Sequence, residues 1–200
     1  MAHENPLHVL TRANEEGHFF KKSQELLGKL RHRLKVEEGA EALAEHSDDV
    51  QDKAVLEELA AVGITPDTVR LMHLIPLFQV AWADGAIQAA EEDLLRREAA
   101  RCGILAGTPV GEAFEGLLKT APSKELCDAA MSYVKALMGS LPADQAEAAK
   151  KDLTKMAHTV ARASGGLFGM FFTVEAEEKS ALDEITGRLN DRAEAVLESL

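Results

Sequence analysis

One stretch of the chain departs from the one-sided apolar pattern of its neighbours. Residues 71–83 (LMHLIPLFQVAWA) contain only two strongly polar side chains, His73 and Gln79. A surface helix carries a single apolar stripe, whereas a helix that is apolar on nearly every side is expected inside the protein. The run is also too short for a bilayer span, which needs about 20 apolar residues. The pattern therefore predicts a buried core helix over residues 71–83.

Local signals predict the ends of this helix. Thr65 and Pro66 favour a helix start, because Thr can cap free amides and Pro fits the first helical position. Pro76 removes one backbone hydrogen bond and predicts a kink. The dipeptide Asp84-Gly85 predicts the end, since Gly adopts a positive φ at little cost.

One-sided apolar patterns predict helices on both sides of the central run. The predicted helices cover residues 14–36, 50–62, 88–102, 109–121, 123–138, 142–163 and 175–197. Residues 1–13 are predicted to be a loose N-terminal arm. The prediction for residues 14–200 is a single all-α domain, a compact helical bundle of about eight or nine helices.

The first of these helices is basic, and the segment after it is acidic. In the first helix, apolar residues recur at helical spacing at Phe19, Phe20, Leu26, Leu27, Leu30 and Leu34. Six basic residues and one acidic residue lie between positions 21 and 35, whereas residues 37–52 include seven acidic ones. One interpretation is a hairpin of two oppositely charged helices that attract each other weakly through water. The other is a basic docking face for an acidic partner.

The turn after the central run contains two candidate metal ligands, Asp84 and Glu91. Their spacing matches the second half of an EF-hand calcium loop. The earlier ligand positions fall on Val80 and Trp82, which offer no side-chain oxygen. The two acids are interpreted either as structural, forming the turn and placing negative charge at a helix start, or as ligands of a cation held with help from elsewhere.

A family resemblance enters with the string VAWADGAIQAAEEDLLRREAARCGI, residues 80–104. It resembles the signature of the tellurite-resistance protein B (TerB-like) family: an alanine-rich helix, Asp-Gly, an aliphatic residue and a Glu that opens the next helix. The resemblance is dense there and loose over residues 50–118. It implies a small helical bundle, a part in tellurite or other stress responses, and a cation role for acidic positions that match Asp84, Glu91 and Glu92.

Composition narrows the function classes. Apolar residues make up 46% and aromatic residues 4% of the 200 positions, which favours helices. The net charge of −12 argues against nucleic acid and against adsorption to anionic membranes. Cys102 and Cys127 are too few for a disulfide framework. The first ten residues lack the features of a signal peptide, so a cytoplasmic location is expected.

Two features of the second half are distinctive. The string VARASG at 160–165 follows VAWADG at 80–85 by 80 residues, and VEAEE at 174–178 parallels IQAAE at 87–91. We interpret this as a degenerate duplication with halves of about 50–120 and 121–200; chance similarity between alanine-rich helices is the alternative.

The second feature is a Gly-rich apolar segment. Its candidate partner-binding residues, unless they fold back into the core, are Leu167, Phe168, Met170, Phe171 and Phe172.

No catalytic constellation is present in the sequence. A single Glu15-x-x-His18 is half of a di-iron pattern that requires a second copy and two further Glu residues. The leading hypothesis is a non-enzymatic, TerB-like cytoplasmic interaction protein with a protein partner, no nucleic acid, no transmembrane segment and no cofactor. The alternative is a divalent-cation-binding protein that uses Asp84 and Glu91.

Overall fold

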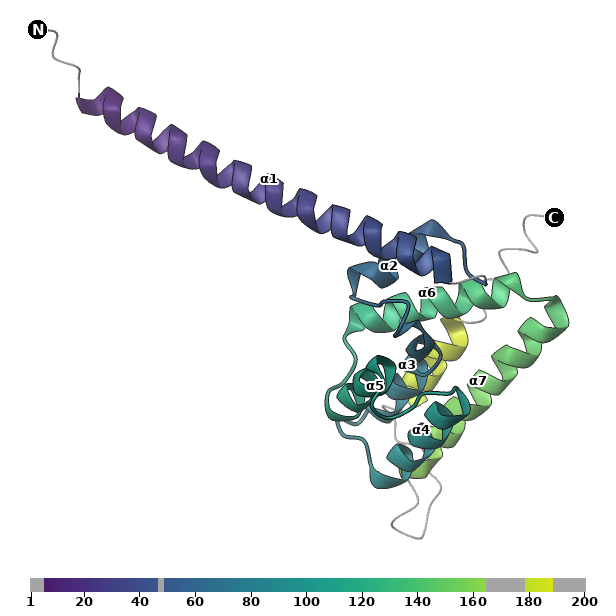
Figure 1. Ribbon diagram of the computed structural model, residues 1–200. Helices are drawn as coiled ribbons and strands as arrows, with labels where there is room; N and C mark the ends of the chain where they lie inside the picture. The colour runs from purple at the N-terminus through teal and green to yellow at the C-terminus, as the bar shows by residue number, and fades with distance from the viewer. Residues whose placement is uncertain (1–5, 47–48, 165–178, 189–200) are drawn as a thin grey trace, which may run out of the picture. The chain divides into compact units, whose positions relative to one another are not determined.

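Helices form all the regular structure that the computed structural model describes. It describes residues 6–46, 49–164 and 179–188, and omits the side chains of residues 6–20, 23 and 164. The eight assigned helices are α1 (Pro6–His46), α2 (Lys53–Ala61), the 3-10 helix η1 (Val69–His73), α3 (Ile75–Ala81), α4 (Ala89–Arg101), α5 (Pro109–Lys119), α6 (Lys124–Ser140) and α7 (Ala143–Ser164) (Figure 1). Residues 179–188 are also helical, and the described ranges contain no strand. The all-α prediction is confirmed.

The chain divides into two units by its contacts, Met1–Glu38 and Gly39–Leu200. The long helix α1 begins at Pro6, within the predicted loose arm, and continues to His46. The predicted hairpin between the basic and the acidic segment is therefore wrong. Residues 37–46 are mostly Glu, Ala and Leu, which favour helix, and no Pro interrupts them.

Gly39 has a packing role in the second unit. A β-carbon built at Gly39 would lie 3.0 Å from the Cβ of Ala60 in α2. The last turns of α1 and helix α2 thus approach each other closely at this point. Ala40 and Leu43 follow Gly39 in α1 and are buried in the core.

The central run forms the core, as predicted, but as two short helices. Apart from Pro76, its buried residues are Leu71, Met72, Leu74, Ile75, Leu77, Phe78, Val80 and Ala81, each at most 2% exposed. The 3-10 helix η1 ends at His73, and α3 starts anew at Ile75 with Pro76 in its first turn. Pro76 lacks an N–H, and the first turn is where that loss costs least. It therefore starts a helix instead of kinking one.

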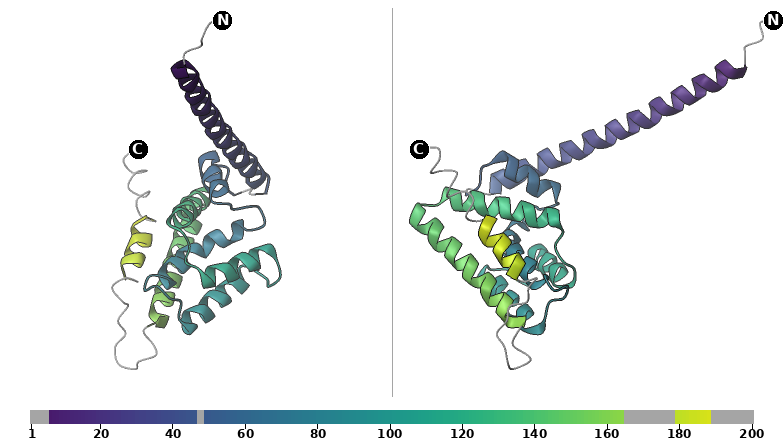
Figure 2. Two further views of the ribbon diagram at one scale, coloured as in Figure 1. Left: turned by 90° about the vertical axis from the view of Figure 1, so that its left-hand side faces the viewer. Right: turned by 180° about the vertical axis from the view of Figure 1, so that it is seen from behind.

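Helix α3 is enclosed by neighbours that come later in the chain. It contacts α4, α6 and α7, and Figure 2 shows this arrangement from two further sides. The rings of Phe78 and Phe114 (α5) meet edge to face, with centroids 5.4 Å apart. On α7, Val160 and Ala161 are buried in the same core.

Several predicted helix ends are confirmed by their hydrogen bonds. The hydroxyl of Thr108 accepts the amide of Gly111 at the start of α5, and that of Ser123 accepts the amide of Leu126 at the start of α6. Gly103 adopts a φ of 72° after α4.

Among the described helices, none combines the length and apolarity that a membrane span requires.

Candidate interaction surface

The Asp-Gly turn has a clear structural basis. Asp84 is exposed, and its Oδ1 accepts the backbone N–H of Ala86 at 3.0 Å. Gly85 adopts a φ of 95°, a conformation in which a β-carbon would be strained, and its amide donates to the carbonyl of Trp82. Asp84 is thus the turn-forming residue that one interpretation of the sequence expects.

Glu91 is buried, in contrast to Asp84. Its side chain is 0% exposed, and its Oε2 accepts the backbone N–H of Gln88 at 2.8 Å. Together, Gln88 and Glu91 form a capping box at the start of α4. This bond satisfies an amide at the helix start, and the carboxylate lies at the positive end of the helix dipole.

The described residues contain no group of three or more His, Cys, Asp or Glu side chains arranged to hold a metal ion. Asp84 and Glu91 each accept a backbone amide within the turn and the helix start. The cation site at these two residues stays a prediction. Calorimetric titration with calcium, magnesium and zinc is its direct test.

Two interactions tie the region of the turn to α5. The indole Nε1 of Trp82 donates to the carbonyl of Leu117 at 2.9 Å. Arg96 on α4 pairs with Glu92 at 2.8 Å and with Glu115 of α5. The hydrogen bond from Arg96 lowers the pKa of Glu115 from its usual range. These contacts hold α4 and α5 in place, which is a structural role.

The two cysteines, Cys127 in the core and Cys102 at the surface, both have thiol pKa values above the usual range. Burial raises the pKa of the Cys127 thiol to about 11 and also raises that of Cys102. A thiol is reactive as the thiolate, so neither is activated at neutral pH. His73 meets the ring of Tyr133 edge to face at 5.8 Å, and burial lowers the imidazole pKa.

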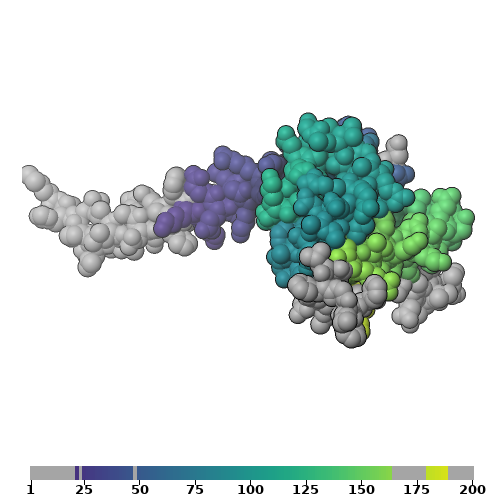
Figure 3. Space-filling model, turned by 90° about the horizontal axis from the view of Figure 1, so that it is seen from below, coloured from purple at the N-terminus to yellow at the C-terminus, as the bar shows by residue number. Residues whose placement is uncertain are grey.

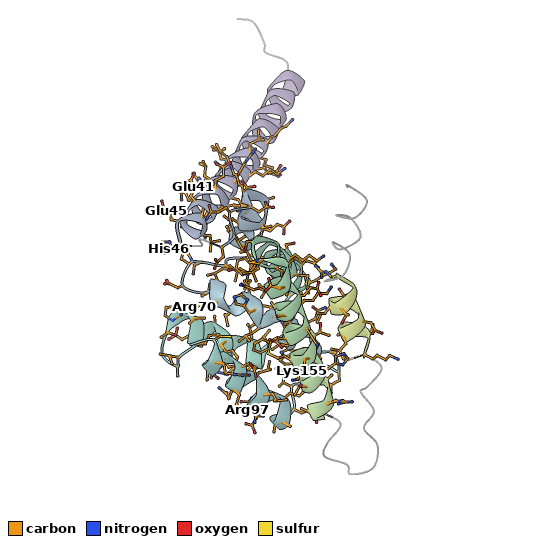
Figure 4. The ribbon with its side chains drawn as sticks, turned by 90° about the vertical axis from the view of Figure 1, so that its right-hand side faces the viewer. Glu41, Glu45, His46, Arg70, Arg97 and Lys155 are labelled. Carbon is orange, nitrogen blue, oxygen red and sulfur yellow. The ribbon has the colours of Figure 1, made fainter. Side chains whose placement is uncertain are left out.

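A groove of about 470 Å³ lies between α4 and α7. Figure 3 shows the surfaces of these two helices side by side, and Figure 4 labels Arg97 on α4 and Lys155 on α7. The groove is lined by Leu94, Glu98, Arg101, Asp152, Lys155, Met156, Thr159 and Val160. Its rim carries two acids and two bases, so it offers no net charge to select a ligand. No local sequence pattern predicts it, because its two walls are far apart in the chain.

The most distinctive surface lies on α1. Leu26, Leu27, Leu30 and Leu34 are 58%, 45%, 54% and 49% exposed. At 3.6 residues per turn they share an arc of about 100°, and they span about 12 Å of helix. We call these four side chains the leucine face. Four leucines gathered on one side of a helix form an apolar patch, whereas single exposed leucines are ordinary.

Basic side chains border the leucine face on both sides. At helical spacing, Lys22, Lys29 and Arg33 follow one edge. Arg31 and Lys35 follow the other edge, and all five side chains are exposed. The sequence shows both the apolar spacing and the basic charge of this segment. That its leucines are exposed in the structure could not be read from the sequence.

The predicted partner-binding residues in the Gly-rich segment (Leu167, Phe168, Met170, Phe171 and Phe172) lie outside the described residues. Their role stays a prediction. The same holds for the second copy of the proposed duplication, because residues 165–178 contain its turn.

Within the described residues, the fold is all-α and helix α1 carries an exposed apolar face. Comparisons with known proteins add no relative: no family model, no curated protein and no solved structure matches the chain.

Proposed function

We propose that the chain is a non-enzymatic, TerB-like interaction protein that binds a protein partner through the leucine face of α1. The observation that carries the proposal is the exposure of Leu26, Leu27, Leu30 and Leu34, each about half accessible to solvent. Covering such a patch removes apolar area from water, which is the main driving force of protein association. The TerB-like part of the proposal, with its role in stress response, is supported by residues 80–104 alone.

The leucine face has the form that helix recognition requires. Leu27, Leu30 and Leu34 follow i, i+3, i+7 spacing, the arrangement by which amphipathic helices anchor in a partner's groove or against a partner helix. Central apolar anchors surrounded by polar side chains are also the usual anatomy of a binding site.

The experiment is a comparison of the full-length chain with the double variant Leu27→Glu/Leu30→Glu as affinity baits. Proteins retained by each bait are quantified by mass spectrometry, and circular dichroism checks that helix content is unchanged. The variant is expected to lose the specific partners, because two charges cannot be buried in an apolar contact without large cost.

The matched control is Leu105→Glu, which introduces a charge at a leucine that is 64% exposed in the second unit. This variant should retain the same partners as the natural chain. An unchanged set of partners for Leu27→Glu/Leu30→Glu would overturn the proposal. A separate deletion of residues 167–172 tests whether the predicted Gly-rich patch contributes to the same binding.

A further inference from the structure

The partner's chemistry follows from the charges around the leucine face, if the proposed function holds. We infer that the leucine face docks an amphipathic helix whose own apolar stripe is bordered by Asp and Glu. Residues 21–35 contain six basic side chains and one acidic side chain, Glu25, in a chain of net charge −12. Five of the six basic side chains, all but Lys21, lie along the two edges of the leucine face and are exposed there.

The position of the charges selects a partner with acidic flanks. Lys29 and Arg33 lie along one edge of the leucine face, and Arg31 lies along the other. If the partner helix has acids on both sides of its apolar stripe, each acid would therefore lie next to a basic side chain. Complementary charges at the rim of an apolar contact raise the association rate and exclude wrong partners. A partner with basic flanks would be repelled at both edges.

A second copy of this helix is a poorer occupant. If two leucine faces met about Leu30, Lys29, Arg31 and Arg33 of one copy would face the same residues of the other, in parallel or antiparallel order. Like charges placed opposite each other are destabilising. The apolar spacing from Phe19 to Leu34 also covers little more than two heptads, whereas a coiled coil sustains its pattern over about three or four.

An anionic bilayer is also a poorer occupant. Glu37 and Glu38 follow Leu34 by three and four residues, so at helical spacing they continue along the leucine face or its edge. A helix lying flat on anionic lipid would bring both carboxylates to a surface that repels them. A protein helix can instead end before Glu37 or present a base there.

The test uses two synthetic helical peptides with one leucine pattern, one flanked by Glu and the other by Lys. Binding of each labelled peptide to the full-length chain is measured by fluorescence anisotropy. The Glu-flanked peptide is expected to bind at least about tenfold more tightly, and the difference should shrink as salt rises from about 0.05 M to about 0.5 M.

Charge reversal gives the sharper result. Arg31→Glu/Arg33→Glu is expected to abolish the preference for the Glu-flanked peptide, because each edge of the leucine face then carries an acid beside its remaining lysines. The matched control, Lys151→Glu/Lys155→Glu on α7, changes the net charge equally at two exposed lysines. It should keep the preference for the Glu-flanked peptide.

Three outcomes would overturn the inference: equal binding of both peptides, a mass that doubles with concentration through the leucine face, or adsorption to phosphatidylserine vesicles in place of peptide binding. The proposed function can survive these results. If Leu27→Glu/Leu30→Glu still loses its partners while the peptides are not distinguished, the surface is right and the acidic partner is wrong. If that double variant loses nothing, the surface itself is wrong.

Discussion

Replacement of Phe78 by Ala tests whether α3 is the centre of the core. Phe78 is 0% exposed, and its ring meets that of Phe114 at 5.4 Å. Truncating a buried Phe costs about 3–5 kcal/mol when the surroundings cannot collapse into the space. Helices α4, α6 and α7 all contact α3, which limits such collapse. We expect a loss of about 4 kcal/mol, or about 8–16 °C in Tm at about 2–4 °C per kcal/mol.

The assay is urea unfolding followed by circular dichroism, with the m-value checked against that of the natural chain. Leu105→Ala, at an exposed leucine, serves as the control and should change stability by less than about 0.5 kcal/mol. The ring pair is isolated by a double-mutant cycle with Phe114→Ala, where a coupling of about 0.5–1.5 kcal/mol is expected. A loss below about 1.5 kcal/mol for Phe78→Ala would refute a core centred on α3.

Three further predictions concern stability around the core. Trp82→Phe removes the hydrogen bond to the carbonyl of Leu117 and should cost about 1–2 kcal/mol in the same unfolding assay. Gly85→Ala should cost about 1–2 kcal/mol, although space is open around the new methyl group, because a φ of 95° strains any β-carbon. Burial lowers the pKa of His73 in the folded state, so the unfolded chain binds more protons below the model-peptide value of about 6.5. Stability should therefore fall as pH drops below that value, and the fall should be smaller in His73→Phe; equal pH slopes would contradict the assigned burial.

The sequence predicts the core well because burial leaves a composition signal. A run of thirteen residues with two polar members can hardly lie on a surface, and residues 71–83 are indeed central. The helix starts at Thr108 and Ser123 could also be predicted from the sequence, because a capping side chain acts on amides only two or three residues away. In each case the physical cause lies within the same short segment that carries the signal.

Two structural expectations were wrong, and one surface could not be predicted. A hairpin was expected from the opposite charges of residues 21–35 and 37–52, but residues 37–46 favour helix and continue α1 to His46. Pro76 was expected to kink a helix, but the chain before it adopts the 3-10 form and the α-helix starts afresh. The groove between α4 and α7 joins residues far apart in the chain, so no spacing rule could have located it.

The contact between Gly39 and Ala60 limits how the sequence can change at both positions. A Cβ at Gly39 would lie 3.0 Å from that of Ala60, closer than ordinary van der Waals contact, so a larger residue at either site would push α2 and the last turns of α1 apart. Ala40 and Leu43 belong to those turns and are buried in the core. A shift of the backbone there would move both side chains out of their packed positions. Such a substitution removes no hydrogen bond and no charge, yet it would destabilise core packing several residues away.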